Sequence, residues 1–244
     1  MFDLSAVQAA IRQYGFDGWL LYDFRGQNLL AQRVVGLAEK KLLSRRWFYY
    51  VPASGEPRKL VHAIEPASLD HLPGGKKTVY RRWQELEAGV GQLVSGAKRV
   101  AMEYSPRNAN PYIGRVDAGT VELVKSFGCD VAASGDLIQL FEATWDDDQE
   151  KSHFEAAKLC RDAYDVAFAF IASEIKAKGS VAETGVQARI MKHFTDNGMT
   201  TYSPPIVGVG PHSGDPHFDT SPATDLAIKP GSFVLVDQIG RAHV

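Results

Sequence analysis

The sequence predicts an α/β protein with a mixed sheet in its first part and an α+β unit in its second part. Helical and strand patterns alternate over residues 1–144, which is typical of helices packed on a sheet. From residue 146 onward two long helical patterns come first and short strand patterns follow. The chain has 244 residues, of which 45% are hydrophobic, and this is enough for two domains with cores of their own.

The composition argues against several classes of partner. The formal net charge is -2 and no basic run is interleaved with aromatic residues, so we expect no nucleic-acid partner. No apolar stretch reaches 18 residues without charges, so we expect no membrane span. The N-terminus lacks a signal-peptide pattern, and Cys129 and Cys160 lack metal-ligand spacing. We therefore expect a cytoplasmic protein with two reduced thiols.

The first part opens with an amphipathic helical pattern. Apolar residues recur at helical spacing up to Tyr14, Ser5 is suited to cap the start, and Gly15 is suited to end the helix. Similar patterns predict further helices at 83–94, 117–127 and 136–143. Apolar and β-branched runs between turn residues predict strands at 17–22, 47–51, 59–64, 78–81, 99–103 and 130–133. The second and third of these strands flank a P-A-S-G-E-P turn, which predicts a hairpin.

The second part opens with a long helix, predicted from 145 to about 178. Three acids at 146–148 suit its positive N-terminal end. Its predicted core face consists of Phe154, Ala157, Cys160, Tyr164, Ala167, Phe168, Ile171 and Ile175. After a break at Gly179, the segment 180–183 (S-V-A-E) predicts a capping box for the next helix, which Asn197 and Gly198 end.

A loop rich in turn formers and a short strand carry the candidate site residues. His217 lies in D-P-H-F, where Pro216 restricts the backbone and Phe218 can anchor the segment. A histidine held in this way can donate to a developing oxyanion or shuttle a proton, although a surface histidine would look similar. His212 lies among small residues, so we expect it to be solvated.

Asp237 follows the apolar run 233–236 at the end of a predicted strand. A carboxylate at a strand end can bind a metal ion, although an acidic turn residue would fit the same pattern. The G-x-S-x-G and H-E-x-x-H motifs are absent from the sequence, which leaves nucleophilic and zincin-type schemes without support.

Taken together, these motifs resemble those of the metallopeptidase family that includes Xaa-Pro aminopeptidases, prolidases and creatinases. The resemblance rests on the loop P-P-I-V-G-V-G-P-H-S-G-D-P-H-F at 204–218 and on K-P-G-S-F-V-L-V-D at 229–237. A linker E-A-T-W at 142–145 and the helix S-V-A-E-T-G-V-Q-A-R-I at 180–190 accompany them. Methionine aminopeptidases are a more distant match, since they lack a long N-terminal domain.

The resemblance implies a creatinase/prolidase-like N-terminal domain at 1–144 and the first half of a pita-bread catalytic domain at 146–238. In this family the pita-bread domain binds two divalent metal ions, here expected to be Mn, Co or Zn. His217 matches the histidine that contacts substrate and steadies the tetrahedral intermediate. Asp237 matches the first metal ligand. The other family ligands, an aspartate, a histidine and two glutamates, follow later in the family pattern.

The expected activity is hydrolysis of a peptide bond next to proline by a metal-activated water. The expected partners are a peptide with proline at its second position and a second copy of the chain in a homodimer. We expect this chain to be a fragment that is itself inactive, with an unpartnered strand at 233–237. Residues 239–244 depart from the family's D-x-G pattern and are expected to be a non-native tail. A creatinase-like amidinohydrolase without metals and a non-catalytic pita-bread binding module remain alternatives.

Overall fold

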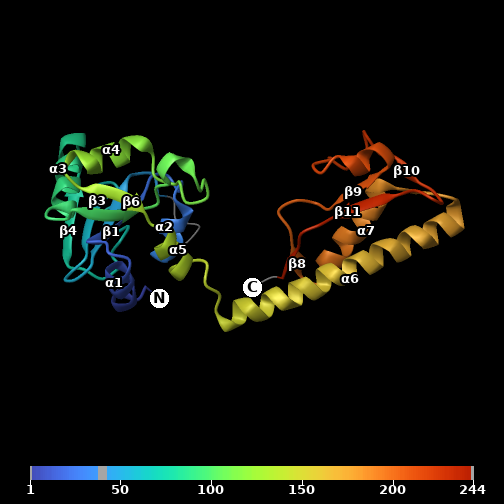
Figure 1. Cartoon of the computed structure of the whole chain (residues 1–244), viewed down its shortest axis with the longest axis horizontal. Coiled ribbons are helices and arrows are strands. Elements are labelled where there is room, and N and C mark those ends of the chain that lie inside the picture. Colours follow the sequence, from blue (N-terminus) through green and yellow to red (C-terminus); the bar gives the residue numbers. More distant parts are fainter. Residues whose placement is uncertain (1, 38–42, 243–244) are drawn as a thin grey trace. The chain divides into compact units, whose positions relative to one another are not determined.

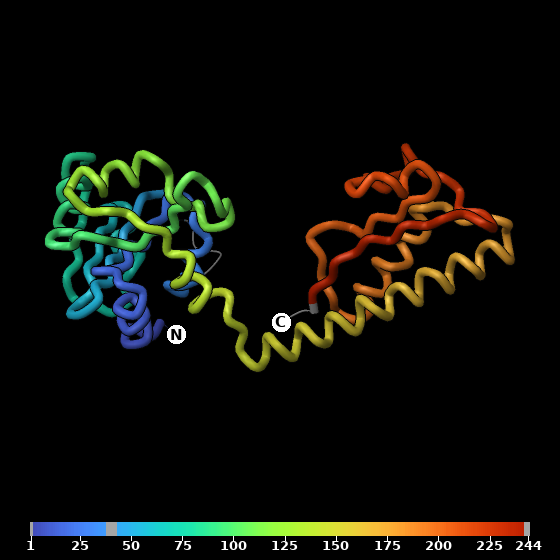
Figure 2. Tube along the Cα trace, in the orientation of Figure 1, coloured from blue at the N-terminus to red at the C-terminus, as the bar shows by residue number. Residues whose placement is uncertain are grey.

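The computed structural model describes residues 2–37 and 43–242, and it divides into two compact units (Figures 1 and 2). Unit 1 extends to Thr144 and unit 2 begins at Trp145. Unit 1 contains a sheet with helices on both faces, whereas unit 2 contains two long helices and short paired strands.

The sheet of unit 1 has six strands in the order β4-β3-β2-β1-β5-β6. The strands are β1 (Gly18–Asp23), β2 (Trp47–Pro52), β3 (Arg58–His62), β4 (Lys76–Tyr80), β5 (Arg99–Met102) and β6 (Asp130–Ala133). Strand β2 is antiparallel to β1 and β3, while the pairs β3–β4, β1–β5 and β5–β6 are parallel. The predicted mixed sheet and the β2–β3 hairpin are therefore confirmed. Five strands run in one direction, and β2 runs in the other.

Helices cover both faces of this sheet. They are α1 (Leu4–Gln13), α2 (Leu29–Val34), α3 (Trp83–Val94), α4 (Ala118–Ser126) and α5 (Gly135–Phe141), with a 3-10 turn η1 at Pro106–Asn108. Side chains of α1, α2 and α5 belong to one core cluster, and side chains of α3 and α4 belong to another. Along β1, Trp19 and Leu21 enter the first cluster while Leu20 and Tyr22 enter the second, as the alternation of a strand requires. All six residues of β1 are buried, as expected of a strand covered on both faces.

Two features of unit 1 differ from the prediction. The side chain of Asp3, not Ser5, accepts from the Ala6 backbone N–H at 3.0 Å and caps α1. Helix α2 was not predicted, because six residues hold too few turns to show a period. Its cap is Asn28, whose side chain accepts from the Ala31 N–H at 3.0 Å.

A buried polar network holds the start of α2 against the sheet. Glu103, which is 0% exposed, accepts hydrogen bonds from Trp19 Nε1 at 2.7 Å, Asn28 Nδ2 at 2.8 Å and Ser134 Oγ at 3.0 Å. Three donors converge on one carboxyl group, as a buried polar group requires. Burial nevertheless raises the pKa of Glu103 above its usual value.

Unit 2 is built around α6 (Asp147–Lys178) and α7 (Glu183–Asp196). Its short strands are β7 (Val181–Ala182), β8 (Met199–Thr200), β9 (Ile206–Val209), β10 (Ala227–Ile228), β11 (Val234–Asp237) and β12 (Arg241–Ala242), with a 3-10 turn η2 at Gly210–Gly214. They form three antiparallel pairs, β7–β10, β8–β12 and β9–β11. The expectation that strand 233–237 lacks a partner is therefore wrong, since β11 pairs with β9 over four positions.

The predicted core face of α6 is partly wrong. Phe154 and Phe168 are 64% and 48% exposed. The residues that α6 buries are Ala156, Ala163, Ala167 and Ile171. Ala167 and Ile171 are buried as predicted, whereas Ala156 and Ala163, which the predicted face left out, complete the buried stripe. Small side chains allow neighbouring helices to pack closely, and α7 packs against α6.

Candidate functional site

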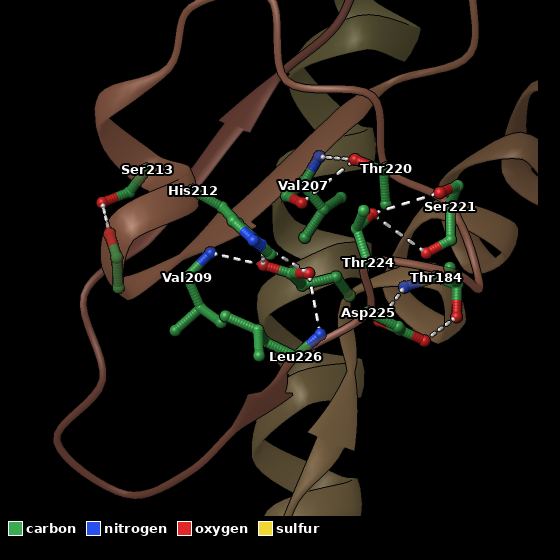
Figure 3. A network of polar contacts seen from close by, with 12 residues as sticks. Thr184, Val207, Val209, His212, Ser213, Thr220, Ser221, Thr224, Asp225 and Leu226 are labelled. Atoms are coloured by element: carbon green, nitrogen blue, oxygen red, sulfur yellow. Dashed lines mark hydrogen bonds and ion pairs between the residues drawn. The ribbon is translucent and has the colours of Figure 1, made fainter.

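Glu183, the first residue of α7, is the centre of a hydrogen-bond network. Its partners Val209, His212 and Leu226 are labelled in Figure 3. Its side chain is 0% exposed and accepts from the Val209 N–H at 2.7 Å, the Leu226 N–H at 3.0 Å and His212 Nδ1 at 2.9 Å. One carboxylate thus ties the end of β9, the turn η2 and the segment before β10 to one helix start. The predicted capping box was wrong, because Ala182 occupies the N-cap position without a side-chain cap.

The start of α7 is capped from a distant part of the chain. Asp225 accepts from the Thr184 N–H at 3.2 Å and from the Thr184 hydroxyl (Figure 3). A carboxylate at a helix N-terminus satisfies backbone donors and suits the helix dipole. Because the two residues are 41 positions apart in sequence, no local motif could have indicated this contact.

His212 is held in the fold and is not solvated as expected. Its side chain is only 20% exposed, and its ring stacks on Phe218 with the ring centroids 3.9 Å apart. Its Nδ1–H donates to Glu183, so Nδ1 carries a proton. The prediction failed because Glu183 lies 29 residues away in sequence. The small neighbours Gly210 and Ser213 suggested a flexible, solvated loop, and nothing near them in sequence indicates the contact with Glu183.

His217 has an exposed side chain on a loop whose backbone is well bonded. Its N–H donates to Asp215 Oδ1 at 2.9 Å, and the next residue, Phe218, is 9% exposed and anchors the loop as predicted. Thr220, a little further on, accepts from the Val207 N–H at 2.9 Å and donates to the Val207 carbonyl at 3.1 Å (Figure 3). The loop thus presents an accessible imidazole on a fixed backbone.

Asp237 is the last residue of β11 and is exposed. It lies opposite Ile206, whereas Val234 lies opposite Val209, the residue before η2. Asp237 and the turn with His212 are therefore at opposite ends of the β9–β11 pair, about 10 Å apart along the strands. Within the described ranges, no group of three or more His, Cys, Asp or Glu residues could hold a metal ion. The described residues therefore do not form a complete metal centre around Asp237.

Part of the chain matches a protein-family model, and its fold is similar to several solved structures. Residues 151–243 match the model of metallopeptidase family M24. The structure is similar to dipeptidase PepE from Mycobacterium ulcerans (TM-score 0.63, 21% identity, covering 96% of this chain and 58% of that chain). It is also similar to the Xaa-Pro dipeptidase from Bacillus anthracis (TM-score 0.58, 16% identity, 98% and 60%). A prolidase from Pyrococcus horikoshii OT3 gives a TM-score of 0.55 at 15% identity, with 96% and 59% covered.

These similarities extend over both units of this chain but over only part of the length of each similar structure. The chain spans about three fifths of the length of the solved structures it matches. At these identities the structural matches show the fold. No curated protein sequence matches the chain. Among the described residues, no helix is long and apolar enough to cross a membrane.

Proposed function

From the match of residues 151–243 to the model of metallopeptidase family M24, we propose that this chain is part of a peptidase that cleaves a peptide bond next to proline. The family match carries the proposal, because it includes both His217 and Asp237. Similarity to a prolidase and an Xaa-Pro dipeptidase supports the same substrate class, a peptide with proline at its second position. No observation favours an amidinohydrolase or a binding module.

In this proposal His217 contacts the substrate. Its imidazole donates to the carbonyl oxygen as negative charge develops there, a contribution of several kcal/mol in comparable sites. The surroundings support this role, because Asp215 and Phe218 hold the backbone while the imidazole stays accessible. Glu183 holds His212 in the preceding turn, and the His212 ring stacks on Phe218, the residue after His217. Glu183 and His212 therefore help to position His217 and have no direct role in the reaction.

Asp237 is proposed as one ligand of a pair of divalent ions, Mn, Co or Zn. Such ions would supply an activated water when bound, but two ions need more ligands than the described residues provide. We further propose that the whole protein is a homodimer and cytoplasmic, the latter because Cys129 and Cys160 are free.

The first experiment is a peptidase assay on purified residues 1–244. With added Mn²⁺ or Co²⁺ and an Xaa-Pro dipeptide, we expect no hydrolysis, because a single carboxylate cannot hold two ions. Turnover above the metal-only blank would contradict the proposed inactivity of the chain alone.

The second experiment uses a longer gene product that contains residues 1–238. Its Xaa-Pro hydrolysis should fall about 100- to 1000-fold in His217→Ala, with bound metal unchanged. Asp237→Asn should instead lower bound metal, measured by atomic emission. His153→Ala, at an exposed position of α6, is the control and should keep full activity. An active longer protein that is indifferent to His217→Ala would overturn the role of His217.

A further inference from the structure

Unit 1 contains a cavity of about 570 Å³ at one edge of its sheet. Tyr22 from the end of β1, His62 from the end of β3 and Tyr80 from the end of β4 line it. Arg45 and Arg46 also line it and directly precede β2, which runs in the opposite direction. The cavity therefore lies at the carboxyl ends of the parallel strands, the edge where open α/β sheets bind ligands.

Four arginines line this cavity, namely Arg45, Arg46, Arg81 and Arg82. None of their guanidinium groups forms an ion pair with another described residue. Two nearby carboxylates are engaged with backbone groups: Glu85 accepts from the Arg81 and Arg82 N–H groups, and Glu65 accepts from the Arg45 N–H. Arg45 attracts the Glu65 carboxylate, and Arg81 and Arg82 attract that of Glu85, without forming an ion pair among the described residues. The guanidinium groups therefore remain open to a bound anion, which all four would attract.

One carboxylate, Asp117, also lines the cavity. It accepts from the Thr120 N–H and hydroxyl, both at 2.8 Å, and from the Tyr22 hydroxyl at 3.1 Å. Burial opposes its ionisation, but these hydrogen bonds hold the pKa of Asp117 below its usual value. The lining therefore combines four guanidinium groups with one carboxylate, which leaves a clear excess of positive charge.

Aromatic and imidazole side chains account for much of the remaining lining of the cavity. Trp83 lines the cavity and is 62% exposed, so much of its surface is open to a ligand. His62 Nδ1 accepts from the Ile64 N–H at 3.0 Å, so the proton of the neutral ring lies on Nε2. The His62 and Tyr80 rings contact edge to face with centroids 4.9 Å apart, and the Tyr80 hydroxyl donates to the Arg46 carbonyl at 2.8 Å. These contacts fix the segment that carries Arg46.

We propose that this cavity binds a small multivalent anion through phosphate or carboxylate groups, with a planar part of the ligand against Trp83. Guanidinium groups match both kinds of oxyanion with paired hydrogen bonds. The volume lies in the range of small-molecule sites. A polymer is disfavoured, because the chain carries a formal net charge of -2 and these cations are gathered in one concave site. The inference is independent of the peptidase proposal.

The test is calorimetric titration of residues 1–244 with sodium pyrophosphate, trisodium citrate and ADP at about 150 mM salt, where exposed charges are screened. We expect saturable binding of at least one probe with one site per chain. Pyrophosphate without citrate would identify phosphate as the ligand group, and citrate without pyrophosphate would identify carboxylate. Arg45→Gln/Arg81→Gln should weaken binding at least about tenfold, because two charge-assisted contacts are lost.

Arg107→Gln/Arg115→Gln is the matched control, since it removes the same charge from exposed positions outside the cavity. It should change affinity less than about twofold, as expected for screened charges. Thermal unfolding checks that the variants fold, and Arg46→Gln/Arg82→Gln replaces the first pair if that pair is unstable. In Trp83→Phe the change in tryptophan fluorescence on adding ADP should disappear. Equal losses in cavity and control variants, no saturable probe, or tighter binding of a single-stranded oligonucleotide than of ADP would overturn the proposal.

Discussion

The two units differ in how many large apolar side chains they bury. In unit 1 the sheet has a core cluster on each face, and large side chains such as Trp19, Trp47 and Phe48 are at most 1% exposed. In unit 2 a single cluster lies between the helices and the short strands. Phe194 is the one residue of unit 2 among the largest fully buried side chains of the described residues, while Phe154 and Phe233 are 64% and 73% exposed.

The difference illustrates two ways of stabilising a fold, by hydrophobic burial and by buried hydrogen bonds. Unit 1 relies on burial, since each strand of its centre is covered on both sides and hydrophobic burial supplies most of the stabilisation. Unit 2 has short two-stranded pairs, which are marginal by themselves. Its loops are instead cross-linked by buried polar contacts, with Glu183 joining three segments. Substitutions in the apolar core of unit 1 should therefore act through lost packing, whereas a substitution of Glu183 in unit 2 should act through lost hydrogen bonds.

The largest effect is expected from Leu60→Ala in β3. Leu60 is 0% exposed in the core of unit 1, so the lost burial and the remaining cavity should cost about 2–5 kcal/mol. Hydrogen exchange followed by mass spectrometry should show faster exchange throughout unit 1 and unchanged exchange in α7. Equal acceleration in both units would mean that they do not have separate cores.

Glu183→Ala should cost about 3 kcal/mol in unit 2, because two backbone N–H groups and His212 lose a buried acceptor. Hydrogen exchange should accelerate over 207–228 before it changes in α6. Glu174→Ala is the control: it removes an i,i+4 contact with Lys178, worth about 0.3–0.5 kcal/mol. If the two variants lose similar stability in urea unfolding, polar cross-links do not hold unit 2 together.

Glu103→Gln should cost about 1–3 kcal/mol in unit 1, because the amide places a donor against Asn28 Nδ2. Burial raises the pKa of Glu103 in the folded state, so the folded state binds this proton more tightly than the unfolded state. The resulting stabilisation is complete below the unfolded value of about 4.3 and is lost as pH rises through the raised folded value.

The stability advantage of the wild type over Glu103→Gln should therefore shrink as pH rises. Urea unfolding at a series of pH values from the acid side to neutrality measures it. An advantage that stays constant, or grows with pH, would contradict the expected direction.

The smallest effect is expected for Lys192→Ala on α7. Lys192 and Asp196 form an exposed i,i+4 ion pair at 2.9 Å, and such pairs contribute about 0.3–0.5 kcal/mol. Added salt should abolish the difference from the wild type in thermal unfolding. A loss above about 1 kcal/mol would show that surface charges matter more in unit 2 than its geometry indicates.

Local patterns determined much of the fold. The helix at 83–94 and the strand at 130–133 were predicted with the bounds that the structure shows, because capping, periodicity and turn residues act over a few positions. The family resemblance also came from contiguous motifs, and the family model confirms it over 151–243. The roles of His217 and Asp237 stay predictions.

Tertiary structure alone decided the rest. The Glu183–His212 contact joins residues 29 positions apart, and the arginine cavity combines segments from three strand ends and the start of a fourth. Helix α6 leaves Phe154 and Phe168 exposed, although the pattern placed both on the core face. The same physical reason applies to all three cases. Burial and side-chain contacts depend on which segments pack together in the fold, and the residue pattern within one segment does not indicate its packing partner.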